Sequence, residues 1–104
     1  METKPVRVVT IPAARREMIQ ASKWYDERSQ GLGNQPLDEI GRSLRTVLDF
    51  PLAQPVVDPP FRRILIDRFP YGLIYRIDSN TIIVVAVANL KRRPGYWQSR
   101  RNKL

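Results

Sequence analysis

Four arginines in the second half of the chain could bind an anionic group, because they fall in or beside segments with a strand-like pattern. They are Arg62, Arg63, Arg68 and Arg76. From the exposed face of a sheet, a guanidinium group can donate two parallel hydrogen bonds to one phosphate. The alternative interpretation is structural, because surface arginines also pair with carboxylates on neighbouring strands, here Asp67 or Asp78.

A second candidate group lies near the C-terminus. It consists of Lys91, Arg92, Arg93, Tyr96 and Trp97. Cationic side chains beside aromatic rings can hold a backbone phosphate and stack a base. The alternative is that Tyr96 and Trp97 pack a terminal turn against the sheet. Both groups are therefore candidates for binding a target or a protein partner.

The chain contains no histidine and no cysteine. Histidine is the commonest general base and the commonest transition-metal ligand. Its absence, together with that of cysteine, excludes a Ser–His or Cys–His nucleophile and argues against a zinc site. We therefore predict no cofactor and no metal, and any catalysis would have to rest on Lys, Arg, Tyr and carboxylate side chains.

The formal net charge of +8 is confined to one part of the sequence. Residues 1–59 hold eight Lys or Arg and eight Asp or Glu, whereas residues 60–104 hold ten Lys or Arg against Asp67 and Asp78. A solvated basic face is the simplest explanation. Concentration of the excess in one half favours an anionic partner, either nucleic acid or an acidic protein.

The length of 104 residues predicts a single domain that spans residues 1–104. No apolar run approaches the roughly 20 residues that cross a bilayer, so no membrane association is predicted. The first residues show no apolar signal region. Together with the lack of cysteine, these features favour a cytoplasmic location.

The first half of the chain predicts a strand followed by two helices. Residues 6–10 are typical of a short strand, and Thr10 is placed to cap a helix that begins with Pro12. Glycines at 31 and 33 end this helix, and Asn34 is placed to cap a second one. The apolar stripes of the two helices are Ala14, Met18, Ala21 and Tyr25, then Leu37, Ile40, Leu44, Val47 and Leu48. Leu44, in the middle of its stripe, is predicted to be buried against the sheet.

The second half predicts strands. Prolines at 51, 55, 59 and 60 indicate a stiff connector without secondary structure. Period-two patterns then predict strands over 61–69, 71–78 and 81–88, the last apolar on both faces and so inside the sheet. Asp78, Ser79 and Asn80 form a hairpin turn, and residues 100–104 are expected to fray. The result is an α+β fold: an N-terminal strand, an αα-hairpin and a three-stranded antiparallel meander in one antiparallel sheet, with the helices on one face.

The order of these residues resembles the RelE/ParE-type toxins of bacterial toxin–antitoxin pairs. The resemblance rests on the segment Phe69-Pro-Tyr-Gly-Leu-Ile-Tyr-Arg76, the run from Ile82 to Ala88 and the ending Lys91-Arg-Arg-Pro-Gly-Tyr-Trp97. Upstream, Trp24-Tyr25 and Gly31-Leu-Gly33 match a WYxE-like element followed by GLG. It covers residues 6–100 and is closer to the ParE branch.

The resemblance implies a toxin of a type II pair that inhibits DNA gyrase and is neutralised by a cognate acidic antitoxin. The alternatives are an endoribonuclease that cleaves mRNA on the ribosome, and a non-toxic relative that only binds its antitoxin. In the nuclease alternative, the matching positions are Arg62 or Arg63, Lys91, Arg92 or Arg93, and Tyr96. Arginine is a poor base, so Lys91 or Tyr96 would need a depressed pKa. Many relatives carry His where this chain has Asn89, which cannot shuttle a proton near neutral pH.

Overall fold

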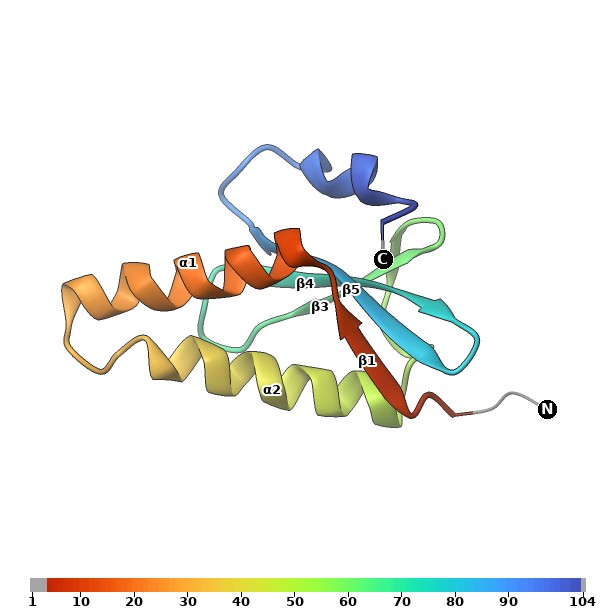
Figure 1. Ribbon diagram of the computed structural model, residues 1–104, viewed down its shortest axis with the longest axis horizontal. Coiled ribbons are helices and arrows are strands. Elements are labelled where there is room, and N and C mark those ends of the chain that lie inside the picture. The colour runs from red at the N-terminus through yellow and green to blue at the C-terminus, as the bar shows by residue number, and fades with distance from the viewer. Residues whose placement is uncertain (1–3, 104) are drawn as a thin grey trace.

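The computed structural model describes residues 4–103 and has an α+β architecture (Figure 1). Strand β1 (Arg7–Thr10) leads into helices α1 (Pro12–Arg28) and α2 (Asn34–Asp49). Four strands follow, namely β2 (Val56–Asp58), β3 (Phe61–Leu65), β4 (Tyr71–Asp78) and β5 (Thr81–Asn89). The chain ends in a short 3-10 helix, η1 (Tyr96–Arg100). The predicted fold class is confirmed.

All five strands form one sheet in the order β1-β5-β4-β3-β2. Strands β2 to β5 pair antiparallel, whereas β1 runs parallel to β5, with Arg7 opposite Thr81 and Thr10 opposite Val84. The prediction of a wholly antiparallel sheet was therefore wrong at this pair. A parallel pair needs a long crossover connection, and here the whole chain between β1 and β5 supplies it. Strand β5 lies inside the sheet, as its apolar pattern predicted.

The proline-rich connector and the first predicted strand differ from expectation. Val56–Asp58 pairs with β3 at the edge of the sheet, so the connector contains a short strand that its prolines concealed. The strand predicted over 61–69 ends at Leu65, because Ile66 N–H donates to Tyr71 O at 2.9 Å and closes a turn. Arg68 lies in that turn with φ 68°, not in a strand.

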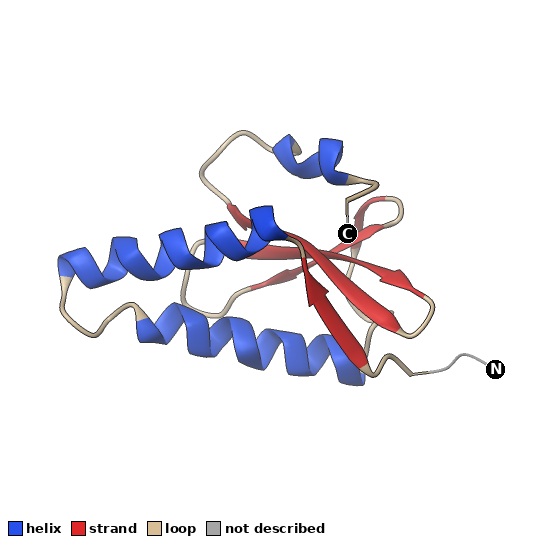
Figure 2. Ribbon diagram, viewed as in Figure 1, coloured by secondary structure: helices blue, strands red, loops and turns tan. Residues whose placement is uncertain are grey.

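The two helices form an antiparallel pair beside the sheet (Figure 2). Helix α1 begins at Pro12 as predicted, but its N-cap is Ile11 and no side chain caps it, so the expected Thr10 cap is wrong. The Ile11 N–H donates to Val84 O at 3.1 Å, so the residue before the helix is still hydrogen-bonded to β5.

The turn between the helices depends on Gly33, which is the N-cap of α2 in place of the expected Asn34. Its N–H donates to the Asp26 carboxylate at 2.8 Å. A Cβ at this position would come within 2.3 Å of Ser22 O. Helix α1 thus approaches the turn so closely that only glycine fits, and its Asp26 supplies the acceptor for the Gly33 N–H.

Most of the predicted apolar stripes face the interior. Ala14, Ala21, Ile40 and Val47 are buried. Leu44 is only half-buried at the margin of the core, and Leu37 is 39% exposed. Leu44 therefore packs against the core but is less buried than predicted.

The sheet has two differently covered faces. On one, Tyr75 donates its hydroxyl to Pro51 O at 2.8 Å, directly after α2. On the other, Trp97 packs edge-on against Phe61, with ring centroids 5.1 Å apart. Alternation along β3 and β4 places Phe61, Arg63, Gly72 and Ile74 on this second face, which the C-terminal segment crosses. No helix among residues 4–103 has the length and apolar character that crossing a bilayer requires.

Candidate binding surface at the C-terminal segment

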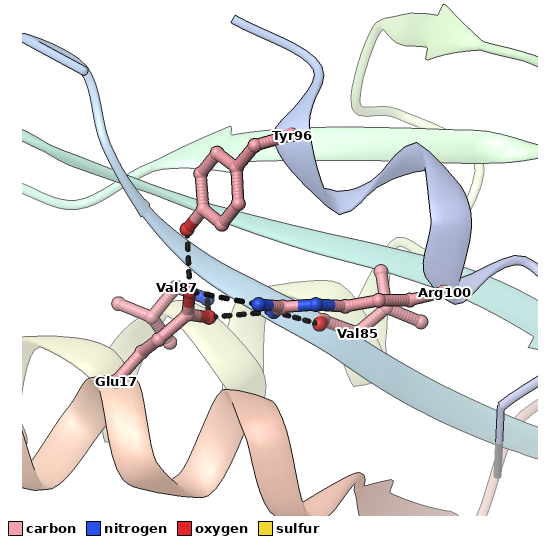
Figure 3. Close-up of polar contacts among 5 residues, drawn as sticks. All are labelled: Glu17, Val85, Val87, Tyr96 and Arg100. Atoms are coloured by element: carbon pink, nitrogen blue, oxygen red, sulfur yellow. Dashed lines mark hydrogen bonds and ion pairs between the residues drawn. The ribbon is translucent and has the colours of Figure 1, made fainter. Parts of the chain in front are cut away.

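A carboxylate on α1 ties the C-terminal helix to the sheet (Figure 3). The Tyr96 hydroxyl donates to Glu17 Oε2 at 2.5 Å, and Arg100 Nη1 donates to Glu17 Oε1 at 2.9 Å. Glu17 Oε1 also accepts the Val87 N–H at 3.0 Å. The Glu17 side chain is 10% exposed, and this set of bonds compensates the cost of burying its charge.

Beyond the end of β1, these bonds satisfy backbone groups on the edge of β5 that faces β1. Tyr75 pairs with Val84 and Ile74 with Ala86, so Val85 is the extra residue of a β-bulge. Arg100 Nη1 donates to the Val85 carbonyl at 3.0 Å. The Glu17–Arg100 pair therefore satisfies two backbone groups of β5 that no strand within residues 4–103 reaches.

The environment of Tyr96 favours its neutral form. Burial raises the pKa of its hydroxyl above the ordinary value of 10.0, and the hydrogen bond and the negative charge of Glu17 add to this, while Arg100 and Arg92 oppose it. The hydroxyl proton is therefore held between Tyr96 and Glu17. Such a group is a poor general base.

The basic turn of residues 91–93 is exposed and is shaped by Asn89. The Asn89 side-chain oxygen accepts the Lys91 N–H at 2.9 Å, and its carbonyl accepts the Arg92 N–H at 3.0 Å. An asparagine that bonds the backbone two residues ahead forms an Asx-turn. Asn89 thus presents the three cations to solvent.

A cavity of about 430 Å³ lies between this segment and the second face of the sheet. Three arginines line it: Arg63 from β3, and Arg92 and Arg93 from the basic turn. Arg92 lies 5.1 Å from the centre of the Tyr96 ring. The structure therefore brings together residues from the two groups that the sequence singled out.

The other three candidate arginines contact carbonyl or carboxylate groups outside this cavity. Arg62 donates to the carbonyls of Gln54 and Leu52 at 2.7 and 3.2 Å. Arg68 bonds the buried Glu39 at 3.2 Å. Arg76 Nη1 lies 3.6 Å from Asp78 Oδ2, a carboxylate of the same strand rather than of a neighbouring strand as the structural interpretation expected. None of these three lines the cavity described above.

The C-terminal residues make more contacts with the rest of the chain than expected. Trp97 is 7% exposed, so its ring is a core group. Arg100 and Arg101 were expected to fray, but Arg100 bonds Glu17, and Arg101 donates to Pro59 O and Asp58 Oδ2 at 2.8 and 2.9 Å. Leu104, at the end of the predicted tail, lies outside the described residues.

Sequence reasoning missed Glu17 and Arg100. A signal for Glu17 was present, because it lies three residues after Ala14 and four before Ala21, on the buried face of α1. A carboxylate in an apolar stripe needs a partner. Arg100 gave no comparable signal within the basic C-terminal run. Within residues 4–103, no cluster of acidic side chains is suited to hold a metal ion.

The family model described as the ParE toxin of the type II toxin–antitoxin system, parDE, matches residues 8–94. No curated protein matches this chain. Among solved structures, a chain from the chromosomal ParDE TA system of P. aeruginosa is similar, with a TM-score of 0.74 and 11% identity. The match covers 86% of this chain and 100% of that chain. At this identity the likeness shows a shared fold.

The family match includes the first helix with Glu17, the bulged strand β5 and the basic turn, and so most of the elements that build this surface. The fold agrees with it independently. The chain therefore belongs to the ParE toxin family of type II toxin–antitoxin systems.

Proposed function

We propose that this protein is a toxin that inhibits DNA gyrase by binding, in the cytoplasm, and that an acidic antitoxin neutralises it. The observation that carries the proposal is the bond between the Tyr96 hydroxyl and Glu17. It gives the tyrosine a structural role and makes its hydroxyl unsuited to act as the general base of RNA cleavage. What the surface offers is exposed positive charge in a fixed turn, which suits binding.

The antitoxin part of the proposal rests on charge and on family membership. The excess of positive charge in residues 60–104 is complementary to an acidic partner. A segment that is disordered when free could fold along this surface as it binds.

Two assays on the purified protein test the target. Gyrase supercoiling should be inhibited, and a translating extract should keep its mRNA intact. Stepwise charge reversal at Lys91, Arg92 and Arg93 should weaken supercoiling inhibition progressively, because a binding surface has no single indispensable residue. Cleaved mRNA with unaffected supercoiling would replace this proposal with the ribonuclease. Loss of both activities with antitoxin binding retained would indicate a non-toxic relative.

Tyr96→Phe removes only the hydroxyl group and so distinguishes gyrase binding from RNA cleavage. We expect inhibition of growth and of supercoiling to change little, since the ring that packs beside Arg92 is kept. A general acid or base would instead contribute roughly 10²–10⁴-fold to the rate. Circular dichroism must first show that the variant is folded at the assay temperature. Loss of toxicity in the folded variant, together with the appearance of cut mRNA for the parent protein, would contradict the gyrase proposal.

A further inference from the structure

The Arg63 side chain is packed in a defined position on the sheet face that the C-terminal segment crosses. Its aliphatic stem lies over Gly72 of β4, where a Cβ would come within 2.9 Å of Arg63 Cδ and 3.1 Å of Cγ. Its Nε is shielded from solvent and has no hydrogen-bond partner. A buried donor without an acceptor costs stability, so the position favours a ligand that supplies one.

The charge around Arg63 is not neutralised. Arg63, Arg92 and Arg93 all line the same cavity, and no residue found around it in the described chain is acidic. The ion pairs formed within residues 4–103 involve other cations: Lys4, Arg42, Arg68, Arg76, Arg100 and Arg101. Arg76 Nε is also buried and unpaired, but that guanidinium is bonded to Asp78 and to Lys103 O. The cavity therefore concentrates free positive charge.

The other residues that line the cavity favour a peptide over a nucleotide as the ligand. Val57, Leu90 and Pro94 give the cavity apolar walls. Neither aromatic ring is free to stack a base, because Trp97 is packed on Phe61 and Arg92 and Arg100 lie 5.1 and 5.2 Å from the centre of the Tyr96 ring. Single-stranded nucleic acid is usually held by such stacking. An anionic group beside an apolar one fits these walls better.

We propose that the cavity binds an acidic side chain of a partner peptide, with its carboxylate side-on to Arg63 and an apolar neighbour against Leu90 and Pro94. A planar carboxylate can accept from Nε–H and from one Nη–H of the same guanidinium. Arg92 and Arg93 then close over the carboxylate from the basic turn. This inference rests on the antitoxin part of the proposed function and does not depend on gyrase as the target.

The test is an NMR titration of the whole protein with two synthetic peptides. One is acetyl-Leu-Glu-Leu-Glu-Leu-amide, and the other carries Gln in place of both Glu. The acidic peptide should shift the Arg63 Nε–H resonance and the backbone resonances of residues 90–95, and the Gln peptide should bind at least about tenfold more weakly, because hydrogen bonds to charged groups are the stronger ones.

Three variants locate the site. Arg63→Gln should weaken the acidic peptide about tenfold or more. Gly72→Ala should weaken it as well, because the added methyl displaces the Arg63 stem. Arg45→Gln removes the same charge from the exposed side of α2 and should leave binding unchanged. If a sheet variant fails to fold, Arg93→Gln, on the exposed turn, gives the same test with a smaller decrease.

The outcomes are distinct. Equal binding of the two peptides, or equal losses in Arg63→Gln and Arg45→Gln, would overturn the proposal. Inorganic phosphate forms a third arm of the titration: a shift of Arg63 Nε–H by phosphate without one by the acidic peptide would show that the cavity binds a phosphate group and would contradict the peptide. Failure of supercoiling inhibition would overturn the gyrase proposal alone, because the titration contains no gyrase.

Discussion

At the scale of single residues, Glu17 joins three parts of the chain that are distant in sequence. It accepts from Tyr96 and Arg100 of the C-terminal helix and from the backbone of β5. A buried carboxylate that loses one partner is destabilised by more than the lost bond, because part of its charge is left uncompensated. The position of the basic turn therefore depends on one side chain of α1.

Alkaline titration tests this arrangement. The pKa of Tyr96 is raised in the folded state, above its ordinary value of 10.0. The folded protein therefore keeps this proton at a pH where the unfolded chain loses it, so the free energy of unfolding should fall as pH rises above about 10. Chemical denaturation at pH 8 to 11 would measure the slope.

Tyr96→Phe is the matched control for that slope, since it removes the titrating hydroxyl and keeps the ring. The substitution should lower the free energy of unfolding by about 1–3 kcal/mol at pH 8. The variant should then lose less stability than the parent protein as pH rises. Burial also raises the pKa values of Tyr71 and Tyr75, so some slope should persist in the variant. Parallel curves for the two proteins would show that Tyr96 titrates normally and that the bond to Glu17 is weak.

At the scale of elements, α2 is held to the sheet by part of its apolar stripe. Ile40 is 4% exposed and Val47 is fully buried, whereas Leu37 is 39% exposed and Leu44 lies at the margin. Glu39 is also buried, and it bonds Arg42 and Arg68, which closes the side of the helix next to the β3–β4 turn. The helix thus presents a narrower apolar face than its sequence indicates.

Alanine substitutions along α2 should follow this burial pattern. Ile40→Ala should lower the free energy of unfolding by about 2–5 kcal/mol, because it leaves a cavity in the core. Leu37→Ala, on the same helix, should cost less than about 1 kcal/mol because its side chain is already in contact with water. Thermal and denaturant unfolding would give both values. Equal costs at the two positions would show that the helix is rotated about its axis relative to this description.

At the scale of the whole molecule, the excess of positive charge is confined to one half of the chain. The entire net excess of +8 comes from residues 60–104. Arg63, Arg92 and Arg93 lie around one cavity, whereas Arg68, Arg100 and Arg101 are paired with carboxylates. An acidic partner would therefore be attracted to one surface rather than to the protein as a whole.

Association with the antitoxin should consequently depend on salt. We expect the association rate, measured by stopped flow, to fall as ionic strength rises from about 0.01 to 0.5 M, because exposed charges are screened over this range. The dissociation rate should change less. Neutral substitutions at Lys91, Arg92 and Arg93 should flatten the dependence, whereas Arg45→Gln should not. An association rate that is independent of salt would exclude electrostatic steering.

The sequence alone was enough for features that depend on neighbours in the chain. Periodicity located both helices and the strands predicted over 71–78 and 81–88, because the side-chain repeat of a helix or strand is local. The absence of histidine and the position of the positive charge also needed no structure. Conversely, the prolines at 55 and 59 hid the strand between them, because the pairing with β3 outweighed local preference.

Only the tertiary structure decided which of the charged residues act together. Arg62, Arg63, Arg68 and Arg76 have similar local sequence signals, yet Arg63 alone of the four enters the cavity, because the other three are bonded to carbonyls or carboxylates elsewhere. The bond between Glu17 and Arg100 joins residues separated by 83 positions. Such contacts depend on the path of the whole chain and on the parallel pairing of β1 with β5, neither of which a local pattern encodes.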